Sequence, residues 1–122
     1  MSSYNTEIID FELDKLQEIN GIIGLAITKR NGLLITSRLP RDIDDRKFGA
    51  MAATMFEAVE IATKNLQNQK ILNLTVEFDD FQIIMLGVTD QIIIISLLEK
   101  NTNIGLVLIE LEEFIVKIRK YE

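Results

Sequence analysis

Two consecutive apolar runs constrain the fold more than any other feature of the sequence. Residues Phe81–Val88 and Ile92–Leu98 are apolar on both faces of an extended chain, and only the turn Thr89-Asp90-Gln91 separates them. A strand with apolar side chains on both faces belongs at the centre of a sheet that is covered on both sides. The short turn favours antiparallel pairing. We therefore expect these two runs to be central strands of an antiparallel sheet with helices on both faces.

Periodic patterns predict the remaining elements. Apolar residues at helical spacing predict three helices, and apolar runs or alternation predict three further strands. Asn31-Gly32 between two apolar runs predicts a two-residue type I′ hairpin turn, in which both central residues have positive φ. The predicted helices span Glu7–Asn20, about Asp44 to Asn68, and a last segment from a cap at Asn101–Asn103 to about Tyr121; the further strands span Ile22–Lys29, Leu33–Ser37 and Ile71–Phe78.

The element order predicts the fold class. It reads helix, hairpin, helix, three-stranded meander, helix, which suits an α/β (α+β) three-layer α-β-α sandwich around a five-stranded antiparallel sheet. The 122 residues suit a single domain, and no linker or internal repeat is visible. We expect residues 1–6 to form a flexible N-terminus and residues 7–122 to form the domain.

The long predicted helix carries more apolar surface than one core requires. Its expected core stripe comprises Phe48, Ala52, Met55, Val59, Ala62 and Leu66, with Phe56 beside it, and a second stripe comprises Met51, Ala58 and Ile61. The helix is therefore either buried inside one monomer or packed on the sheet by one stripe and on a second subunit by the other. Small residues at Gly49, Ala50 and Ala53 would permit close approach to that subunit.

The first strand of the meander supports the second alternative. In Ile71–Phe78, the even-numbered residues from Leu72 to Phe78 are apolar, whereas Asn73, Thr75 and Glu77 point the other way. This strand contains no proline and lies first in its meander, so we expect an exposed sheet edge, which invites pairing with a second copy of itself. The sequence thus predicts an isologous dimer in which like strands and like long helices meet across a two-fold axis.

The amino-acid composition excludes most kinds of catalytic and metal-binding site. The chain has no Cys and no His, which excludes thiol nucleophiles, disulfides, Ser-His-Asp triads and zinc sites with Cys or His ligands. No glycine-rich phosphate loop is present, and the pairs Asp44-Asp45 and Asp79-Asp80 are typical of helix capping and turns. We therefore expect no catalytic residue, no metal, no cofactor and no small-molecule substrate.

Charge and hydropathy narrow the partners and the compartment. The chain has 13 basic and 19 acidic residues and a net charge of −6, which disfavours nucleic-acid binding. The longest apolar run, Gln91–Leu98, is far shorter than the ~20 residues of a membrane helix. Residues Met1–Asp10 carry acids where a signal peptide has basic residues. We expect a cytoplasmic protein without membrane insertion.

A group of basic residues lies around the hairpin and the start of the long helix. It comprises Lys29, Arg30, Arg38, Arg41, Arg46 and Lys47. The group is either ordinary solvated surface or a patch that meets an acidic or phosphate-bearing partner.

Nearly the whole chain resembles a Roadblock (dynein light-chain Roadblock) domain. The resemblance is carried by the amphipathic first helix, by GIIGLAITKRNGLLITS (Gly21–Ser37), by KFGAMAATMFEAVEIATKNL (Lys47–Leu66), by the meander of Leu74–Lys100 and by the helix NIGLVLIELEEFIVKI (Asn103–Ile118). It implies a profilin-like sheet of order 2-1-5-4-3, with the long helix on one face and both terminal helices on the other. It also implies dimers that join through the third strand, with the long helices side by side.

The resemblance further implies a function. Prokaryotic Roadblock domains resemble regulators of small Ras-like GTPases, and eukaryotic relatives are scaffolds in dynein motors and lysosomal GTPase-anchoring complexes. The leading hypothesis is a non-enzymatic homodimer that binds a small Ras-like GTPase, as an activator or an effector-type platform. The residues expected on the dimer or partner surface of the long helix are Arg46, Lys47, Ala50, Met51, Thr54, Ala58 and Ile61. Asn73, Thr75 and Glu77 are expected on the dimer edge strand, and Arg30, Arg38 and Arg41 are expected to steer the partner electrostatically.

Two alternatives stay open. One is a structural adaptor, which is the same dimer in a larger complex without any effect on GTP hydrolysis. The other is a profilin-like or PAS-like ligand-sensing domain, which requires a cavity of ~300 Å³ or more lined by polar groups. The apolar central strands and the absence of His, Cys and Trp speak against the ligand-sensing alternative.

Overall fold

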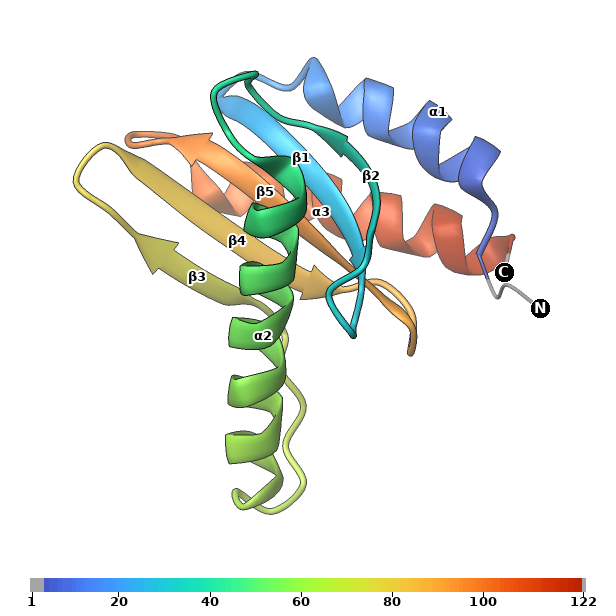
Figure 1. The fold of residues 1–122 in the computed structure, drawn as a ribbon, viewed down its shortest axis with the longest axis vertical. Helices are drawn as coiled ribbons and strands as arrows, with labels where there is room; N and C mark the ends of the chain where they lie inside the picture. Colours follow the sequence, from blue (N-terminus) through green and yellow to red (C-terminus); the bar gives the residue numbers. More distant parts are fainter. Residues whose placement is uncertain (1–3, 122) are drawn as a thin grey trace.

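The computed structural model of the chain describes residues 4–121 (Figure 1). Along the chain the elements are α1 (Thr6–Gln17), β1 (Ile22–Lys29), β2 (Leu34–Arg38), α2 (Asp45–Lys64), β3 (Leu74–Glu77), β4 (Phe81–Gly87), β5 (Ile92–Glu99) and α3 (Ile104–Lys120). Side-chain oxygens of Asn5, Asp44 and Asn103 accept hydrogen bonds from backbone N–H groups in the first turns of the three helices. These caps explain where each helix begins.

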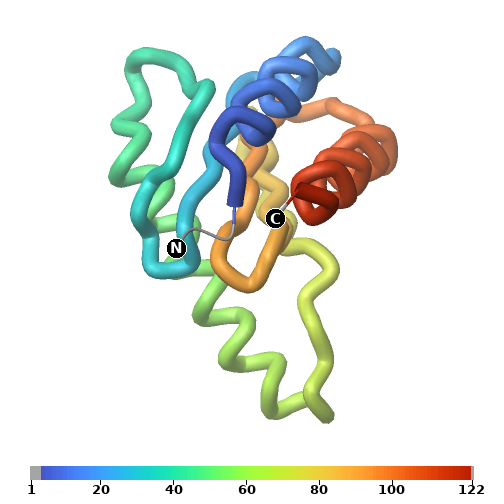
Figure 2. The backbone as a smooth tube through the Cα atoms, turned by 90° about the vertical axis from the view of Figure 1, so that its right-hand side faces the viewer, coloured from blue at the N-terminus to red at the C-terminus, as the bar shows by residue number. Residues whose placement is uncertain are grey.

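All five strands form one antiparallel sheet of order β2-β1-β5-β4-β3. Strand β5 lies at its centre, and seven of its eight residues are buried. Helices α1 and α3 lie on one face of the sheet and α2 lies on the other, so the chain forms three layers (Figure 2). The predicted fold class, strand order and placement of the helices are confirmed.

Each face of the sheet carries its own apolar core. On the face of the two terminal helices, Ile9 and Leu13 of α1 and Leu111 and Ile118 of α3 pack on alternate residues of the strands. On the other face, Phe56 of α2 packs with small and branched strand residues. The double coverage explains why β4 and β5 are apolar on both faces.

The predicted core stripe of α2 is right at Ala52 and at Phe56 beside it, and wrong at Met55, Ala62 and Leu66. The buried residues of α2 are Gly49, Ala52, Ala53 and Phe56. Met55 and Leu66, which were expected in the core, are 39% and 60% exposed. The small residues allow the helix to lie close to the strands: a Cβ at Gly49 would lie only 2.8 Å from the Thr28 methyl carbon. Gly49 and Ala53 therefore serve contact with the sheet and not with a second subunit.

Helices α1 and α2 and strand β3 are shorter than predicted, and α1 ends at Gln17 instead of Asn20. Helix α2 ends at Lys64 instead of Asn68, because Gln67 and Asn68 have φ values of 60° and 59°. Positive φ at consecutive residues is incompatible with a right-handed helix. Strand β3 begins at Leu74 instead of Ile71, and its pairing with β4 ends where Leu74 faces Met85.

The hairpin between β1 and β2 uses a different turn from the one predicted. Only Gly32 has positive φ, at 97°, and Asn31 does not. The Gly32 N–H donates to the Lys29 carbonyl at 2.9 Å, and the Lys29 N–H donates to the Leu33 carbonyl at 2.8 Å. The connection is therefore a three-residue loop with a bulge at its glycine, instead of a two-residue type I′ turn. A separate register shift, between Ile27 and Thr28, leaves Ile35 of β2 without a partner residue on β1.

The predicted flexible N-terminus falls partly outside the described residues, at positions 1–3. Within the described part, Tyr4 packs against the core of the terminal helices, and Asn5 caps α1. The division between a flexible segment of residues 1–6 and a domain of residues 7–122 stays a prediction.

Beneath α2, the buried hydroxyl of Thr28 supplies a first test of the packing. Within residues 4–121 this hydroxyl oxygen has no hydrogen-bond partner. Thr28→Val keeps the shape and removes the unpaired group, so we expect the free energy of unfolding to rise by about 1 kcal/mol in urea denaturation. Thr36→Val is the matched control, because the Thr36 hydroxyl bonds with both Asp10 and Arg38. Its substitution is expected to lower stability, and equal effects of the two variants would contradict this account.

Candidate dimer and partner surface

The side of α2 that faces away from the sheet is mostly apolar and exposed. We call it the outward face of α2; it comprises Lys47, Ala50, Met51, Thr54, Met55, Ala58 and Ile61, all exposed. These positions recur at three- and four-residue spacing and so lie on one side of the helix. Met51 is 62% exposed and Ile61 is 55% exposed. An apolar strip of this length on a helix is unusual for a surface that faces only water.

The outward face also presents few unsatisfied polar groups. The Thr54 hydroxyl donates to the Ala50 carbonyl one turn earlier, at 2.9 Å, which turns the polar end of this side chain back onto the helix. Arg46 lies elsewhere: at ~100° per residue it is about 140° around the helix from Met51. Six of the seven predicted surface residues of α2 therefore share one face, and Arg46 lies on its flank.

Strand β3 is an open edge of the sheet. It pairs only with β4, so its other side has no strand partner within residues 4–121. Thr75 and Glu77 are exposed and point away from the α2 side. Asn73 lies just before the strand, and its side-chain oxygen accepts a hydrogen bond from the Thr75 hydroxyl at 2.9 Å. The three predicted edge residues therefore lie together on one exposed face.

The opposite side of β3 is apolar and only partly covered. Leu74 and Val76 are half-buried beside the core beneath α2, whereas Leu72 and Phe78 are 85% and 49% exposed. Helix α2 packs over β1, β2 and β5 and leaves β3 to one side (Figure 1). The outward face of α2 and the apolar side of β3 therefore form two neighbouring apolar surfaces on the same side of the sheet.

The three predicted steering arginines do not form one patch. Arg30 follows β1 at the hairpin loop and contacts α2, whereas Arg38 ends β2 at the other end of the hairpin and pairs with Asp10 and Asp14 of α1. The two arginines thus lie on opposite faces of the sheet, and carboxylates already balance their charges. Arg41 is exposed and has no ion pair within residues 4–121.

Sequence reasoning missed the shortest ion pair within residues 4–121. Both Glu60 carboxylate oxygens lie 2.6 Å from Nη1 of Arg30, and Nη2 of Arg30 donates to the Thr89 carbonyl at 3.2 Å. The guanidinium also lies 5.5 Å from the centre of the Phe56 ring. A Cβ at Gly87 would lie 2.7 Å from Nη2, so this glycine makes room for the arginine. Arg30 thereby ties the hairpin loop to α2 and to the β4–β5 turn.

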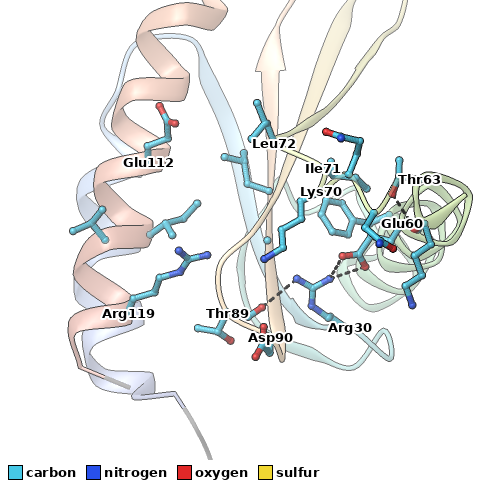
Figure 3. Close-up of a pocket in the computed structure, with 18 residues that line it drawn as sticks. Arg30, Glu60, Thr63, Lys70, Ile71, Leu72, Thr89, Asp90, Glu112 and Arg119 are labelled. Atoms are coloured by element: carbon cyan, nitrogen blue, oxygen red, sulfur yellow. Dashed lines mark hydrogen bonds and ion pairs between the residues drawn. The ribbon is translucent and has the colours of Figure 1, made fainter. Parts of the chain in front are cut away.

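A cavity of about 740 Å³ opens at the end of the sheet beside this ion pair. We call it the sheet-end cavity (Figure 3). It is lined by Arg30, Phe56, Glu60, Thr63, Lys64, Asn68, Gln69, Lys70, Ile71, Leu72, Leu86, Gly87, Thr89, Asp90, Glu112, Ile115, Val116 and Arg119. It exists because β4 continues past its last pair with β3, at Met85, and the segment between α2 and β3 passes at a distance. Its volume exceeds the ~300 Å³ that the ligand-sensing alternative requires.

No group of three or more Asp, Glu, His or Cys side chains in residues 4–121 is arranged to hold a metal ion. No helix in the same range has the length and hydropathy to span a membrane.

Comparison with known proteins assigns the chain to a family. Residues 8–97 match the Roadblock/LC7 domain. The uncharacterized protein MJ0714 of Methanocaldococcus jannaschii is 27% identical over 112 residues, covering 92% of this chain and 94% of that protein.

Solved structures share the fold. MglB of Myxococcus xanthus superposes with a TM-score of 0.90 at 19% identity, over 99% of this chain and 92% of that one. Profilin of Schizosaccharomyces pombe superposes with a TM-score of 0.61 at 15% identity, over 88% of this chain and 90% of that one. The family match covers most of the chain, including α2, β1 to β4 and β5 as far as Leu97. The chain belongs to the Roadblock/LC7 domain family.

Proposed function

We propose that the chain acts as a homodimer that binds a small Ras-like GTPase and modulates its nucleotide state. The observation that carries the proposal is the apolar outward face of α2 beside the open edge of β3. The protein would act by binding, as a regulator in the cytoplasm, and not by catalysing a reaction of its own.

The two surfaces fit a single two-fold contact. If β3 pairs with β3 of a second copy in antiparallel fashion, the two sheets become continuous, and both copies of α2 lie on the same side of the joined sheet. The outward faces of α2, with Met51 and Ile61 at their centres, can then meet across the axis. The partly covered apolar side of β3 lies beneath them. One symmetric contact thereby covers both exposed apolar surfaces and the unpaired strand edge.

The GTPase assignment rests on membership of the Roadblock family and on the basic residues beside α2. Arg41, Arg46 and Lys47 are exposed at the start of α2, next to the proposed two-fold contact. They are the basic side chains that would meet an acidic partner at this end of α2, and Asp42, Asp44 and Asp45 lie between them in the sequence. Any stimulation of hydrolysis would arise by reshaping the switch loops of the GTPase.

The structural adaptor is the second candidate, because the same dimer serves it equally well. Purified protein mixed with each Ras-like GTPase of the same genome distinguishes the two. A stable complex that changes the rate of GTP hydrolysis or nucleotide exchange supports the regulator. A complex with unchanged rates supports the adaptor, and no complex with any of the GTPases contradicts both the GTPase regulator and a GTPase-binding adaptor.

Charge reversal at the start of α2 tests the partner surface separately from the dimer. Arg41→Glu combined with Arg46→Glu is expected to slow association with the GTPase by about tenfold at low salt, with a smaller effect at high salt, because steering is screened by ions. Stopped-flow or surface-based kinetics measures this, and light scattering checks that the dimer mass is unchanged. Lys100→Glu with Lys120→Glu is the matched control for net charge. Equal slowing by both pairs would show that net charge alone matters.

A further inference from the structure

The sheet-end cavity brings together basic side chains from four separate segments, one of which is Lys64 at the end of α2. Arg30 comes from the β1–β2 loop, Lys70 from the segment between α2 and β3, and Arg119 from the last turn of α3. Figure 3 shows the Lys70 amine and the Arg119 guanidinium directed toward the space between α3 and the end of the sheet, with Arg30 on the far wall. No sequence motif places these residues together; the fold does.

These cations differ in how their charge is balanced. Glu60 pairs with Arg30, but Arg30 Nε is buried and has no hydrogen-bond partner within residues 4–121. Arg119 Nε donates to the Val88 carbonyl at 2.7 Å, which fixes the guanidinium at the cavity wall and engages no carboxylate. Within the same range, neither Lys70 nor Arg119 has an ion-pair partner. The cavity lining thus holds three positive charges without an ion pair within the described residues, on Lys64, Lys70 and Arg119.

The acidic residues of the lining do not cancel these charges. Glu60 is engaged by Arg30. Figure 3 shows the Glu112 carboxylate directed along α3 away from Arg119, and it shows Asp90 at the rim beyond Thr89. The lining therefore has four basic side chains against three acidic ones, and one of the acidic ones is already paired with Arg30.

Apolar side chains form one part of the remaining wall, and Thr63, Asn68, Gln69 and Thr89 form another. Phe56, Ile71, Leu86, Ile115 and Val116 line the cavity together with the exposed Leu72. A volume of about 740 Å³ lies within the ~300–1,000 Å³ that is usual for small-molecule sites. The apolar part of the wall can hold the body of a ligand, and the charged part can fix its orientation.

We propose that the sheet-end cavity binds a small anionic molecule with an apolar body, whose carboxylate or phosphate group is held by Lys70 and Arg119. The apolar body lies against Ile71, Ile115 and Val116. The site is on the side of α2 opposite its outward face and shares Leu72 with the proposed dimer contact, but it needs no residue of a second copy or of a GTPase partner.

Titration of the whole protein with small probes tests the site. Hexyl phosphate, hexanoate, inorganic phosphate and 1-hexanol are added separately up to about 10 mM, and backbone amide NMR shifts are followed. Saturable shifts at Lys70–Leu72, Gly87 and Thr89 are expected with one or both hexyl anions. 1-Hexanol and inorganic phosphate are expected to bind at least about tenfold more weakly, because 1-hexanol lacks the negative charge and inorganic phosphate lacks the apolar chain. A preference between the two hexyl anions identifies the head group.

Variants separate the proposed contacts from general charge effects. Lys70→Gln and Arg119→Gln are each expected to weaken hexyl-anion binding about tenfold, and Lys70→Arg is expected to retain it. Lys100→Gln, outside the cavity lining, is the matched control and should bind as the unmodified protein does. If Arg119→Gln disturbs folding, Lys70→Gln alone tests the proposal, because the Lys70 side chain makes no ion pair within residues 4–121 that its loss would break.

Three results would overturn the proposal. The first is the absence of saturable shifts at the cavity residues with either hexyl anion. The second is binding of 1-hexanol as tight as that of the anions. The third is unchanged affinity in both Lys70→Gln and Arg119→Gln.

Discussion

Met51→Glu is expected to convert the protein from a dimer into a monomer of 13.9 kDa. In the proposed contact, Met51 lies on the outward face of α2 and meets the same face of the second copy. The two-fold axis doubles the substitution, so two carboxylates enter an apolar contact without partners. Burying each unpaired carboxylate costs about 2 kcal/mol or more, so the dissociation constant of the dimer should rise by at least ~10³-fold. Light scattering at micromolar concentration measures the mass directly.

A variant on another helix controls for the added charge. Leu106 of α3 is 61% exposed, nearly the same as the 62% of Met51, and lies on the opposite side of the sheet. Leu106→Glu should therefore leave the mass unchanged. A mass near 13.9 kDa for the unmodified protein would rule out the dimer, as would a Met51→Glu variant that keeps twice that mass.

Phe56→Ala is expected to lower the free energy of unfolding by about 3–5 kcal/mol, which is a large part of the ~5–15 kcal/mol typical of a domain. Phe56 is 2% exposed and is the one large side chain that α2 buries among its described residues. Its removal leaves a cavity between α2 and the sheet and also removes the ring beside the Arg30 guanidinium. Urea denaturation monitored by circular dichroism measures the loss.

Met55→Ala is the matched control, because it removes a side chain of similar size from the adjacent position. Met55 is 39% exposed on the outward face of α2, so its loss should cost under about 1 kcal/mol in the monomer. Both variants are measured at several protein concentrations, which separates folding from dimerisation. A larger cost for Met55→Ala than for Phe56→Ala would contradict the observed orientation of α2.

The order and type of the elements were predictable because local patterns carry them. Helix caps at Asn5, Asp44 and Asn103 depend on a few consecutive residues. The doubly apolar runs of β4 and β5 require cover on both faces, whichever helices supply it. The same reasoning predicted that one strand would be an open edge, and β3 is that edge. The expectation that Asn73, Thr75 and Glu77 pair with a second copy stays a prediction.

The orientation of α2 was not predictable from its pattern. Apolar residues occur on both sides of this helix, so periodicity alone could not decide whether Met55 or Phe56 is buried. The contact of Gly49 with Thr28 and the space for Phe56 beside Arg30 and Gly87 decide it. Such a fit depends on side chains from distant strands, which a local pattern does not contain.

The sequence by itself determined the layers, the antiparallel sheet and the excess of apolar surface on one helix, because backbone geometry and hydrophobic spacing act over a few residues. Only the tertiary structure decided which side of α2 faces the sheet, which arginines are already paired and where a cavity opens. Arg30 and Glu60 are 30 positions apart, and Lys70 and Arg119 are 49 apart. Contacts between such residues exist only after the chain has packed, since the close approach of separate elements creates them.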